Sequence, residues 1–165
     1  MTDTLSDTAK TDRVSLVWFV VLCLAVAAAG GAVTATSVTT WYAGLAKPSF
    51  NPPDSVFGPV WTTLYLMIAV AGHRLWRARG AAGRTRALVL WFAQLAVNCA
   101  WSFVFFGAHR PDLALVDIVA LLVLIVAGIV AFARVDRVAA WLFVPYLAWV
   151  SFAAVLNAAI WHLNP

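Results

Sequence analysis

Five long apolar stretches constrain the fold of this chain more than any other feature. They cover residues 14–35, 56–76, 87–107, 113–133 and 139–163, which is nearly all of its 165 residues. Each is long enough to cross a hydrocarbon core of roughly 30 Å as an α-helix. Because 64% of the residues are hydrophobic and only 11% are charged, the chain cannot cover its surface with polar groups in water. We therefore predict an all-α membrane protein, a five-transmembrane-helix bundle solvated by lipid.

Positive charge is distributed unevenly between the two sides of such a bundle. Nine basic residues fall on one side of a five-pass topology, namely Lys10, Arg13, Arg74, Arg77, Arg79, Arg84, Arg86, Arg134 and Arg137. Only Lys47 and Arg110 fall on the other side. The positive-inside rule then places the N-terminus in the cytoplasm and the C-terminus outside. Since this pattern accounts for the net charge of +4, we expect no nucleic-acid partner.

The first 13 residues are polar and predict a disordered cytoplasmic N-terminal tail. Residues 14–165 then form one five-helix membrane domain, and no separate soluble domain remains. An alternative is that the first apolar stretch is a cleaved signal peptide, because a basic segment precedes it and alanines follow. Its apolar run of about 20 residues is longer than a usual signal core, which favours a retained helix.

The sequence lacks the familiar patterns of catalytic and metal sites. It has no glycine-rich phosphate loop, no His-x-x-x-His pair and no evident Ser/His/Asp trio. Cys23 and Cys99 lie inside predicted spans and are expected to be buried apolar residues rather than ligands. We therefore predict no metal site, no tightly bound cofactor and no confident catalytic residue.

The loop between the first two spans is stiff and rich in aromatic residues. Pro48, Pro52 and Pro53 prevent a helix there and hold the backbone near polyproline geometry. Trp41 and Phe50 place large rings in the same segment. At the mouth of a membrane bundle, such a loop (residues 41–55) is interpreted as a lid over a cavity.

Helical spacing places amide and indole side chains on common faces. The sets are Trp91, Gln94, Asn98 and Trp101 on the third span, Pro145, Trp149, Ala153 and Asn157 on the fifth, and Trp61 with Tyr65 on the second. Unpaired amides are costly in hydrocarbon, so they must face the bundle interior. They can serve hydrogen bonding between helices, or they can orient a flat ligand in a pocket with aromatic walls. The small side chain of Ala153 would leave room for that ligand.

Three other features have simpler interpretations. Four tryptophans near the cytoplasmic span ends predict an aromatic belt, namely Trp18, Trp76, Trp91 and Trp141. Ala27, Gly31 and Ala35 form a row of small residues, with Ala28 and Ala32 beside it, that could serve packing inside the bundle or a homodimer. Asp117 lies near the outer end of the fourth span, where a structural hydrogen bond is favoured over proton relay.

Five motifs occur in order along the chain. They are Trp41-Tyr42…Lys47-Pro48…Phe50…Pro52-Pro53, Pro59-Val60-Trp61-Thr62…Tyr65, Gln94-Leu95…Asn98…Trp101…Phe105-Phe106-Gly107, Ala114-Leu115-Val116-Asp117, and Pro145-Tyr146-Leu147-Ala148-Trp149…Ala153…Leu156-Asn157. Together they resemble the TspO/MBR family of tryptophan-rich sensory proteins and translocator proteins. The resemblance covers nearly all of the chain beyond the tail.

The resemblance implies a five-helix bundle, often a homodimer, that binds porphyrins such as protoporphyrin IX and other flat apolar molecules. With the faces above, it defines a candidate ligand site of Trp41, Pro48, Phe50, Pro52, Pro53, Trp61, Tyr65, Gln94, Asn98, Trp101, Trp149, Ala153 and Asn157. The fifth span lacks the basic residue of the animal sterol pattern, since Trp161-His162 stand in its place, so sterol transport is not supported. Without a mitochondrial targeting stretch, a bacterial cell membrane is the expected location.

Three functions remain open at this point. The first is a porphyrin sensor or transporter, which the resemblance favours. The second is light- and oxygen-dependent porphyrin degradation, in which Trp61 and Trp149 would take part in the photochemistry of the pigment. The third is a membrane assembly or accessory protein whose tryptophan-rich faces bind other helices. A proton-coupled exporter is less favoured, because Asp117 lies too close to the membrane surface.

Overall fold

The chain is almost entirely helical. The computed structural model describes residues 2–165, with side chains from Asp12 onward. The described residues form no strand, and their helices are α1 (Thr2–Ser37), α2 (Trp41–Gly44), α3 (Asp54–Arg77), α4 (Arg84–Ser102), the π-helix η1 (Phe103–Gly107), α5 (Pro111–Ala133), α6 (Arg137–Leu142) and α7 (Val144–Leu163). Five helical segments are long and apolar enough to cross a membrane, which confirms the predicted five-helix architecture.

Local sequence explains where these helices begin. Helix α3 starts at Asp54, directly after Pro53, and an acidic residue in a first turn complements the helix dipole. Helix α5 starts at Pro111, whose missing N–H is harmless at that position. Helix α1 begins at Thr2, whereas the sequence predicts a disordered tail over residues 1–13. Residues 2–13 contain neither proline nor glycine, so no helix breaker separates them from the first span.

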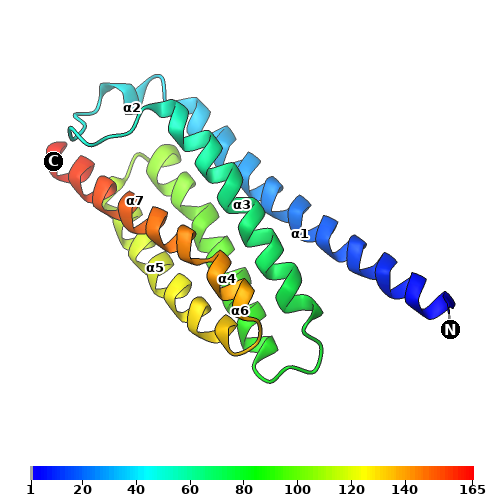
Figure 1. Cartoon of the computed structure of the whole chain (residues 1–165). Helices are drawn as coiled ribbons and strands as arrows, with labels where there is room; N and C mark the ends of the chain where they lie inside the picture. Colours follow the sequence, from blue (N-terminus) through cyan, green and yellow to red (C-terminus); the bar gives the residue numbers. More distant parts are fainter. Residues whose placement is uncertain (1) are drawn as a thin grey trace.

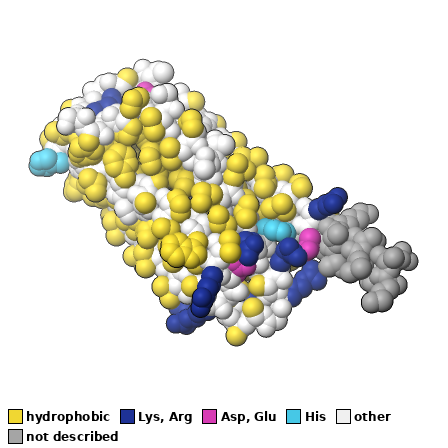
Figure 2. Space-filling view, viewed as in Figure 1, with side chains coloured by type: hydrophobic (Ala, Val, Ile, Leu, Met, Phe, Trp, Pro, Cys, Tyr) yellow, Lys and Arg dark blue, Asp and Glu magenta, His cyan; other side chains and the backbone are white. Residues whose placement is uncertain are grey.

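The bundle has two distinct ends (Figure 1). Helix α2, the loop that follows it and the C-terminus lie together at the end that we call the loop end. The 78–83 and 134–136 connections lie at the opposite end, which we call the arginine end. Figure 2 shows dark blue Lys and Arg side chains gathered there, with hydrophobic side chains over much of the visible surface between the two ends. The main helix contacts are α4 with α5, α1 with α3, and α5 with α7.

Trp91 does not belong to the aromatic belt that the sequence predicts for it. Its side chain is fully buried at 0% exposure, and its Nε1 donates a hydrogen bond to the Ile68 carbonyl at 2.9 Å. Trp18, Trp76 and Trp141 are exposed, as a belt requires. The prediction is therefore wrong for Trp91 alone, because spacing along α4 does not show that α3 leaves space for this ring.

An ion pair joins α3 to α6 at the arginine end. Asp136 caps α6 by accepting a hydrogen bond from the Ala139 N–H, and Arg74 Nη2 lies 2.9 Å from its Oδ2. Burial alone would raise the pKa of Asp136. The hydrogen bonds from Arg74 and from the backbone outweigh burial, so the pKa lies below its ordinary value.

We expect the Asp136→Asn variant to be less stable than the wild type at neutral pH, by up to about 1 kcal/mol. Asparagine preserves the cap but not the ion pair. Because the folded-state pKa is depressed, this contribution is complete above the unfolded-state pKa near 4 and is lost as the pH falls through the folded-state value. Melting temperatures of both proteins in detergent should therefore converge on acidification. A difference that stays constant from neutral to strongly acidic pH would contradict the ion-pair account.

Candidate ligand-binding cavity

A cavity of about 450 Å³ lies inside the bundle, in the half nearer the loop end. Helix α1 contributes small residues to its wall, including Ala27, Gly30 and Gly31. Helices α3, α4, α5 and α7 supply the other sides, and Tyr42 of α2 lies at the loop end. This volume is within the range of roughly 300–1,000 Å³ that is typical of small-molecule sites.

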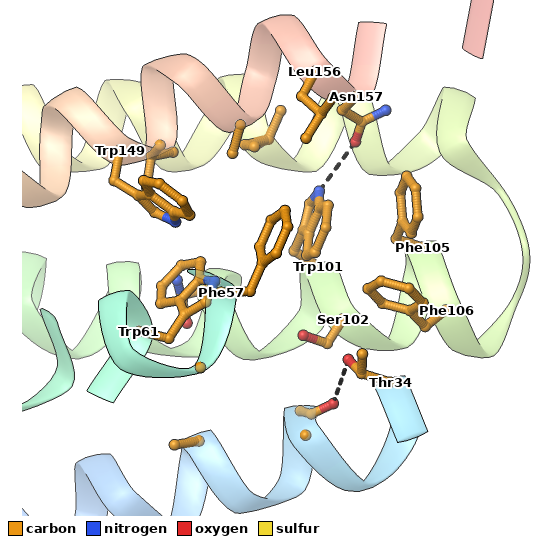
Figure 3. A pocket seen from close by; sticks show the side chains of 18 of the residues that line it. Thr34, Phe57, Trp61, Trp101, Ser102, Phe105, Phe106, Trp149, Leu156 and Asn157 are labelled. Carbon is orange, nitrogen blue, oxygen red and sulfur yellow. Dashed lines mark hydrogen bonds between the residues drawn. The ribbon is translucent and has the colours of Figure 1, made fainter. Parts of the chain in front are cut away.

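Aromatic rings form most of the visible wall (Figure 3). Trp101 stacks on Phe105 with ring centroids 4.9 Å apart, and Trp61 lies 5.5 Å from Tyr65. Trp149 meets Phe57 edge to face at 5.8 Å. Such a wall offers both ring faces and ring edges, which suits a flat and largely apolar molecule.

The π-helix η1 shapes the wall near the loop end. The Ala108 N–H bonds to the Phe103 carbonyl at 2.8 Å, a five-residue step that widens the turn. Phe105 and Phe106 are consecutive, yet both are buried and both line the cavity. A regular α-helix turns successive side chains about 100° apart, so the wide turn brings a second ring toward the cavity.

The amides of the cavity are already engaged in hydrogen bonds between helices. Asn98 accepts a bond from the Tyr65 hydroxyl at 2.6 Å and donates one to the Tyr146 hydroxyl at 2.9 Å. Asn157 accepts a bond from Trp101 Nε1 at 3.1 Å and donates to the Pro111 carbonyl. The interior location that the sequence predicts for these amides is confirmed. Their bonds serve helix packing, and both residues also line the cavity.

Gln94 occupies a different place from the one expected of a ligand contact. It is fully buried but is not among the residues that line the cavity. Its Nε2 donates to the Trp91 carbonyl at 2.9 Å, while its Oε1 has no hydrogen-bond partner among the described residues. Gln94 therefore lies in the packed core between the cavity and the arginine end.

Charged side chains occur in or beside the described part of the cavity wall only near the loop end. Asp54 is the one charged residue among the described residues that line it. The Lys47 ammonium lies 4.5 Å above the ring of Tyr42, which lines the cavity. Burial and the nearby Asp54 raise the pKa of Tyr42, although a hydrogen bond with Asn51 partly offsets them. A bound molecule would thus meet apolar walls in the interior and charged groups at the loop end.

The central part of the loop, residues 43–53, lies outside the cavity wall and is bonded to the residue that follows α7. Asn164 accepts a hydrogen bond from the Ala46 N–H at 3.0 Å and donates one to the Ala46 carbonyl at 3.0 Å. Phe50 is 47% exposed and contacts Phe152 with ring centroids 6.4 Å apart. The central part of the loop therefore does not line the cavity. Tyr42 and Asp54, which lie before and after it in the chain, both do.

Trp41 stabilises the end of η1 instead of lining the cavity. Its ring stacks on His109 at 4.4 Å, and His109 has a positive φ of 54°. Ser37 Oγ donates to the Phe106 carbonyl at 2.8 Å and lies 3.1 Å from His109 Nε2. These contacts hold the end of the π-helix against α1.

The structure divides the candidate residues into two groups. Seven line the cavity: Trp61, Tyr65, Asn98, Trp101, Trp149, Ala153 and Asn157. Six are not among the described residues that line it: Trp41, Pro48, Phe50, Pro52, Pro53 and Gln94. Sequence reasoning missed the contribution of α1. The row containing Ala27 and Gly31 was the available signal, since both residues line the cavity whereas Ala28, Ala32 and Ala35 do not.

Asp117 does not contribute to the cavity wall. Its side chain is half-buried, and its Oδ2 has no hydrogen-bond partner within the described part of the chain. The neighbouring Ile118 lines the cavity instead. The role of Asp117 stays a prediction.

Comparison with known proteins agrees with the sequence motifs. Residues 19–162 match the model of the TspO/MBR family. The chain is 46% identical over 145 residues to the tryptophan-rich protein TspO of Chlorobaculum tepidum, covering 87% of this chain and 92% of that protein. It is 37% identical to the protein CrtK of Rhodobacter capsulatus, covering 92% and 95%. It is 43% identical to the translocator protein of Homo sapiens, covering 75% of each chain.

Proposed function

Because the chain belongs to the TspO/MBR family, we propose that it binds a flat tetrapyrrole, such as protoporphyrin IX, in its aromatic cavity and acts as a sensor or transporter of that ligand. The names of its relatives, which include a translocator protein and a tryptophan-rich sensory protein, support a membrane sensor or transporter role. The ligand class is our own proposal and depends on the chemistry of the cavity.

The observation that carries this proposal is the composition of the cavity wall. Three indole rings, those of Trp61, Trp101 and Trp149, line a space of about 450 Å³ within the membrane-spanning part of the bundle. Aromatic faces stack favourably on a conjugated macrocycle. The amides of Asn98 and Asn157 are bonded within the protein, so shape and stacking would dominate recognition.

The distribution of charge gives the ligand a preferred direction. Carboxylate groups of a porphyrin would find no cation deep in the wall, because Asp54 is the one charged residue among the described lining residues. Lys47 lies at the loop end, above Tyr42. We therefore place the carboxylates toward the loop end, where Lys47 and solvent would offset the like charge of Asp54, and the apolar edge toward Trp149.

The remaining cellular context is proposed from charge and composition. The positive-inside bias supports an N-terminus in the cytoplasm of a bacterial cell and a C-terminus outside. Exposed small residues on α1, including Ala28, Ala32 and Ala35, would allow a second copy of the chain to approach closely in a homodimer.

A titration of the purified protein with protoporphyrin IX tests the proposal. We expect saturable quenching of tryptophan fluorescence. The double variant Trp61→Ala/Trp149→Ala should weaken the affinity by about tenfold or more, which corresponds to about 1.4 kcal/mol. The matched control is Trp18→Ala/Trp141→Ala, which removes two exposed indoles far from the cavity and should leave Kd unchanged. Equal Kd values in the two double variants would contradict a ligand site between Trp61 and Trp149.

The position of Trp61 and Trp149 also favours a second candidate function. Both indoles line the cavity, where they could exchange electrons with an excited pigment. Absorbance of the bound porphyrin under light, in air, distinguishes this function from binding alone. Bleaching that requires the protein and is lost in Trp149→Phe would support degradation, whereas a spectrum unchanged by the protein would leave the binding role.

A further inference from the structure

The Trp149 side chain lines two separate spaces in the structure, a cavity and a groove. The first is the internal cavity, and the second is an open groove of about 580 Å³ between α3 and α7. The groove is lined by Val60, Thr63 and Met67 on one helix and by Pro145, Ala148 and Phe152 on the other. Trp149 is the one side chain among the described residues that lines both. On this side of the bundle, the Trp149 side chain therefore lies between the cavity and the groove.

The groove suits an apolar molecule dissolved in the membrane. All of its residues lie within the two helical segments assigned to cross the hydrocarbon core. Its one hydroxyl, on Thr63, already donates to the Pro59 carbonyl at 3.0 Å. Pro145 and Ala148 are exposed on the surface that would face lipid. The apolar edge of a porphyrin would partition from the bilayer into such a groove without losing hydrogen bonds, with its carboxylates held toward the loop end as in the cavity.

The Trp149 ring has no polar anchor. Its Nε1 is buried and lacks a hydrogen-bond partner among the described residues. By contrast, the indole nitrogens of Trp91 and Trp101 both donate hydrogen bonds. Trp149 is held only by packing, with the rings of Phe57 and Phe152 at 5.8 and 5.5 Å. A rotation of this ring would therefore break no hydrogen bond described in the structure.

The helices on either side of Trp149 are not packed closely on each other. Helices α3 and α7 are not among the pairs of described helices that make extensive contact, whereas α5 packs closely on α7. At the loop end the situation differs, because two hydrogen bonds join Ala46 to Asn164 and a third joins Tyr42 to Asn51. Passage beneath the loop would require these bonds to break.

We propose that the ligand enters and leaves the cavity sideways, from the hydrocarbon phase through the groove between α3 and α7, with the Trp149 ring as the gate. This inference rests on the proposed function, in which the cavity holds a porphyrin. It adds a route to that function and assigns the groove a role in ligand exchange rather than in affinity.

The test measures the rates of protoporphyrin IX binding and release by stopped-flow fluorescence in lipid nanodiscs. Ala148→Trp places a large ring in the groove outside the gate and leaves the cavity wall unchanged. Both the association and the dissociation rate should fall about tenfold or more, with Kd unchanged, because only the barrier between the states rises. Thr63→Trp obstructs the same groove from α3, so a folding defect in one variant leaves the other available.

Two control variants locate the route. Val123→Trp adds the same ring to an exposed position on α5, 64% exposed and remote from the groove, and should preserve both rates. Asn164→Ala releases the loop from α7 and should also preserve them. Faster exchange in Asn164→Ala, with unchanged rates in Ala148→Trp and Thr63→Trp, would place the route beneath the loop and overturn the proposal.

Two further outcomes separate this proposal from the proposed function. Thr62 lines the side of the cavity between α1 and α3. Slower exchange in Thr62→Trp, with unchanged rates in both groove variants, would place the entrance there and would also contradict the proposed role of Trp149 as a gate. Absence of saturable binding by the wild type would reject the proposed function itself. Saturable binding with wild-type rates in both groove variants would reject the gate alone.

Discussion

Replacement of Ala153 by phenylalanine is expected to weaken porphyrin binding strongly while the bundle remains folded. Ala153 lines the cavity one turn after Trp149 and one turn before Asn157, so a benzyl group there would project into the space that the ligand needs. The cavity of about 450 Å³ can accept the ring without displacing backbone. We expect Kd to rise about a hundredfold or more, equivalent to about 2.7 kcal/mol, in the fluorescence titration.

The matched control is Val155→Phe, two residues further along the same helix. Val155 is 59% exposed and does not line the cavity, so this variant adds a similar ring to the lipid-facing surface. Its Kd should equal that of the wild type, and melting temperatures should be similar for all three proteins. A folded Ala153→Phe protein with wild-type affinity would show that the ligand binds elsewhere.

Replacement of Gly72 by alanine is expected to destabilise the protein strongly for so small a change. An added Cβ at this position would lie 2.6 Å from Trp91 Cε2 and 2.7 Å from Phe19 Cδ1. Both rings are fully buried and cannot move away without disturbing the contact between α1, α3 and α4. Overpacking of this kind costs about 1–3 kcal/mol, which exceeds the gain of roughly 0.5–1 kcal/mol from higher helix propensity.

The matched control for this variant is Gly31→Ala on α1. An added Cβ at Gly31 would meet no heavy atom within 4 Å, so only the favourable helix propensity should act. Thermal unfolding in detergent should therefore show a lower melting temperature for Gly72→Ala and an equal or higher one for Gly31→Ala. Shifts of the same sign and size in both variants would contradict the packing argument.

Much of the fold follows from local features of the chain. An apolar run that is long enough to cross a bilayer is stable in lipid only as a membrane helix, because its backbone hydrogen bonds must be made within the segment. This holds whatever its neighbours are. Pro53 and Pro111 mark where two of these helices begin. The interior location of Asn98 and Asn157 was likewise predictable, because an unpaired amide is costly against lipid wherever the helix packs.

The composition of the cavity could be predicted only in part. Trp61, Trp101 and Trp149 were predicted to share helical faces with Tyr65, Asn98 and Asn157, and all three line the cavity. The contact of the loop prolines with a ligand stays a prediction; they are not among the lining residues, and hydrogen bonds between Ala46 and Asn164 join this part of the loop to the end of α7. Those bonds join residues far apart in the chain, and no local pattern indicates them.

The sequence by itself determined the number of spans, the class of the protein and the amides that must face inward, because each depends on the transfer of one segment or one group from water to hydrocarbon. Only the tertiary structure decided which aromatic rings enclose empty space. Trp91 and Trp101 share one face of α4, but Trp91 fills the gap beside Gly72 whereas Trp101 borders the cavity. The difference arises from the neighbouring helices, since the space available to a ring is a property of the packed bundle and not of its own helix.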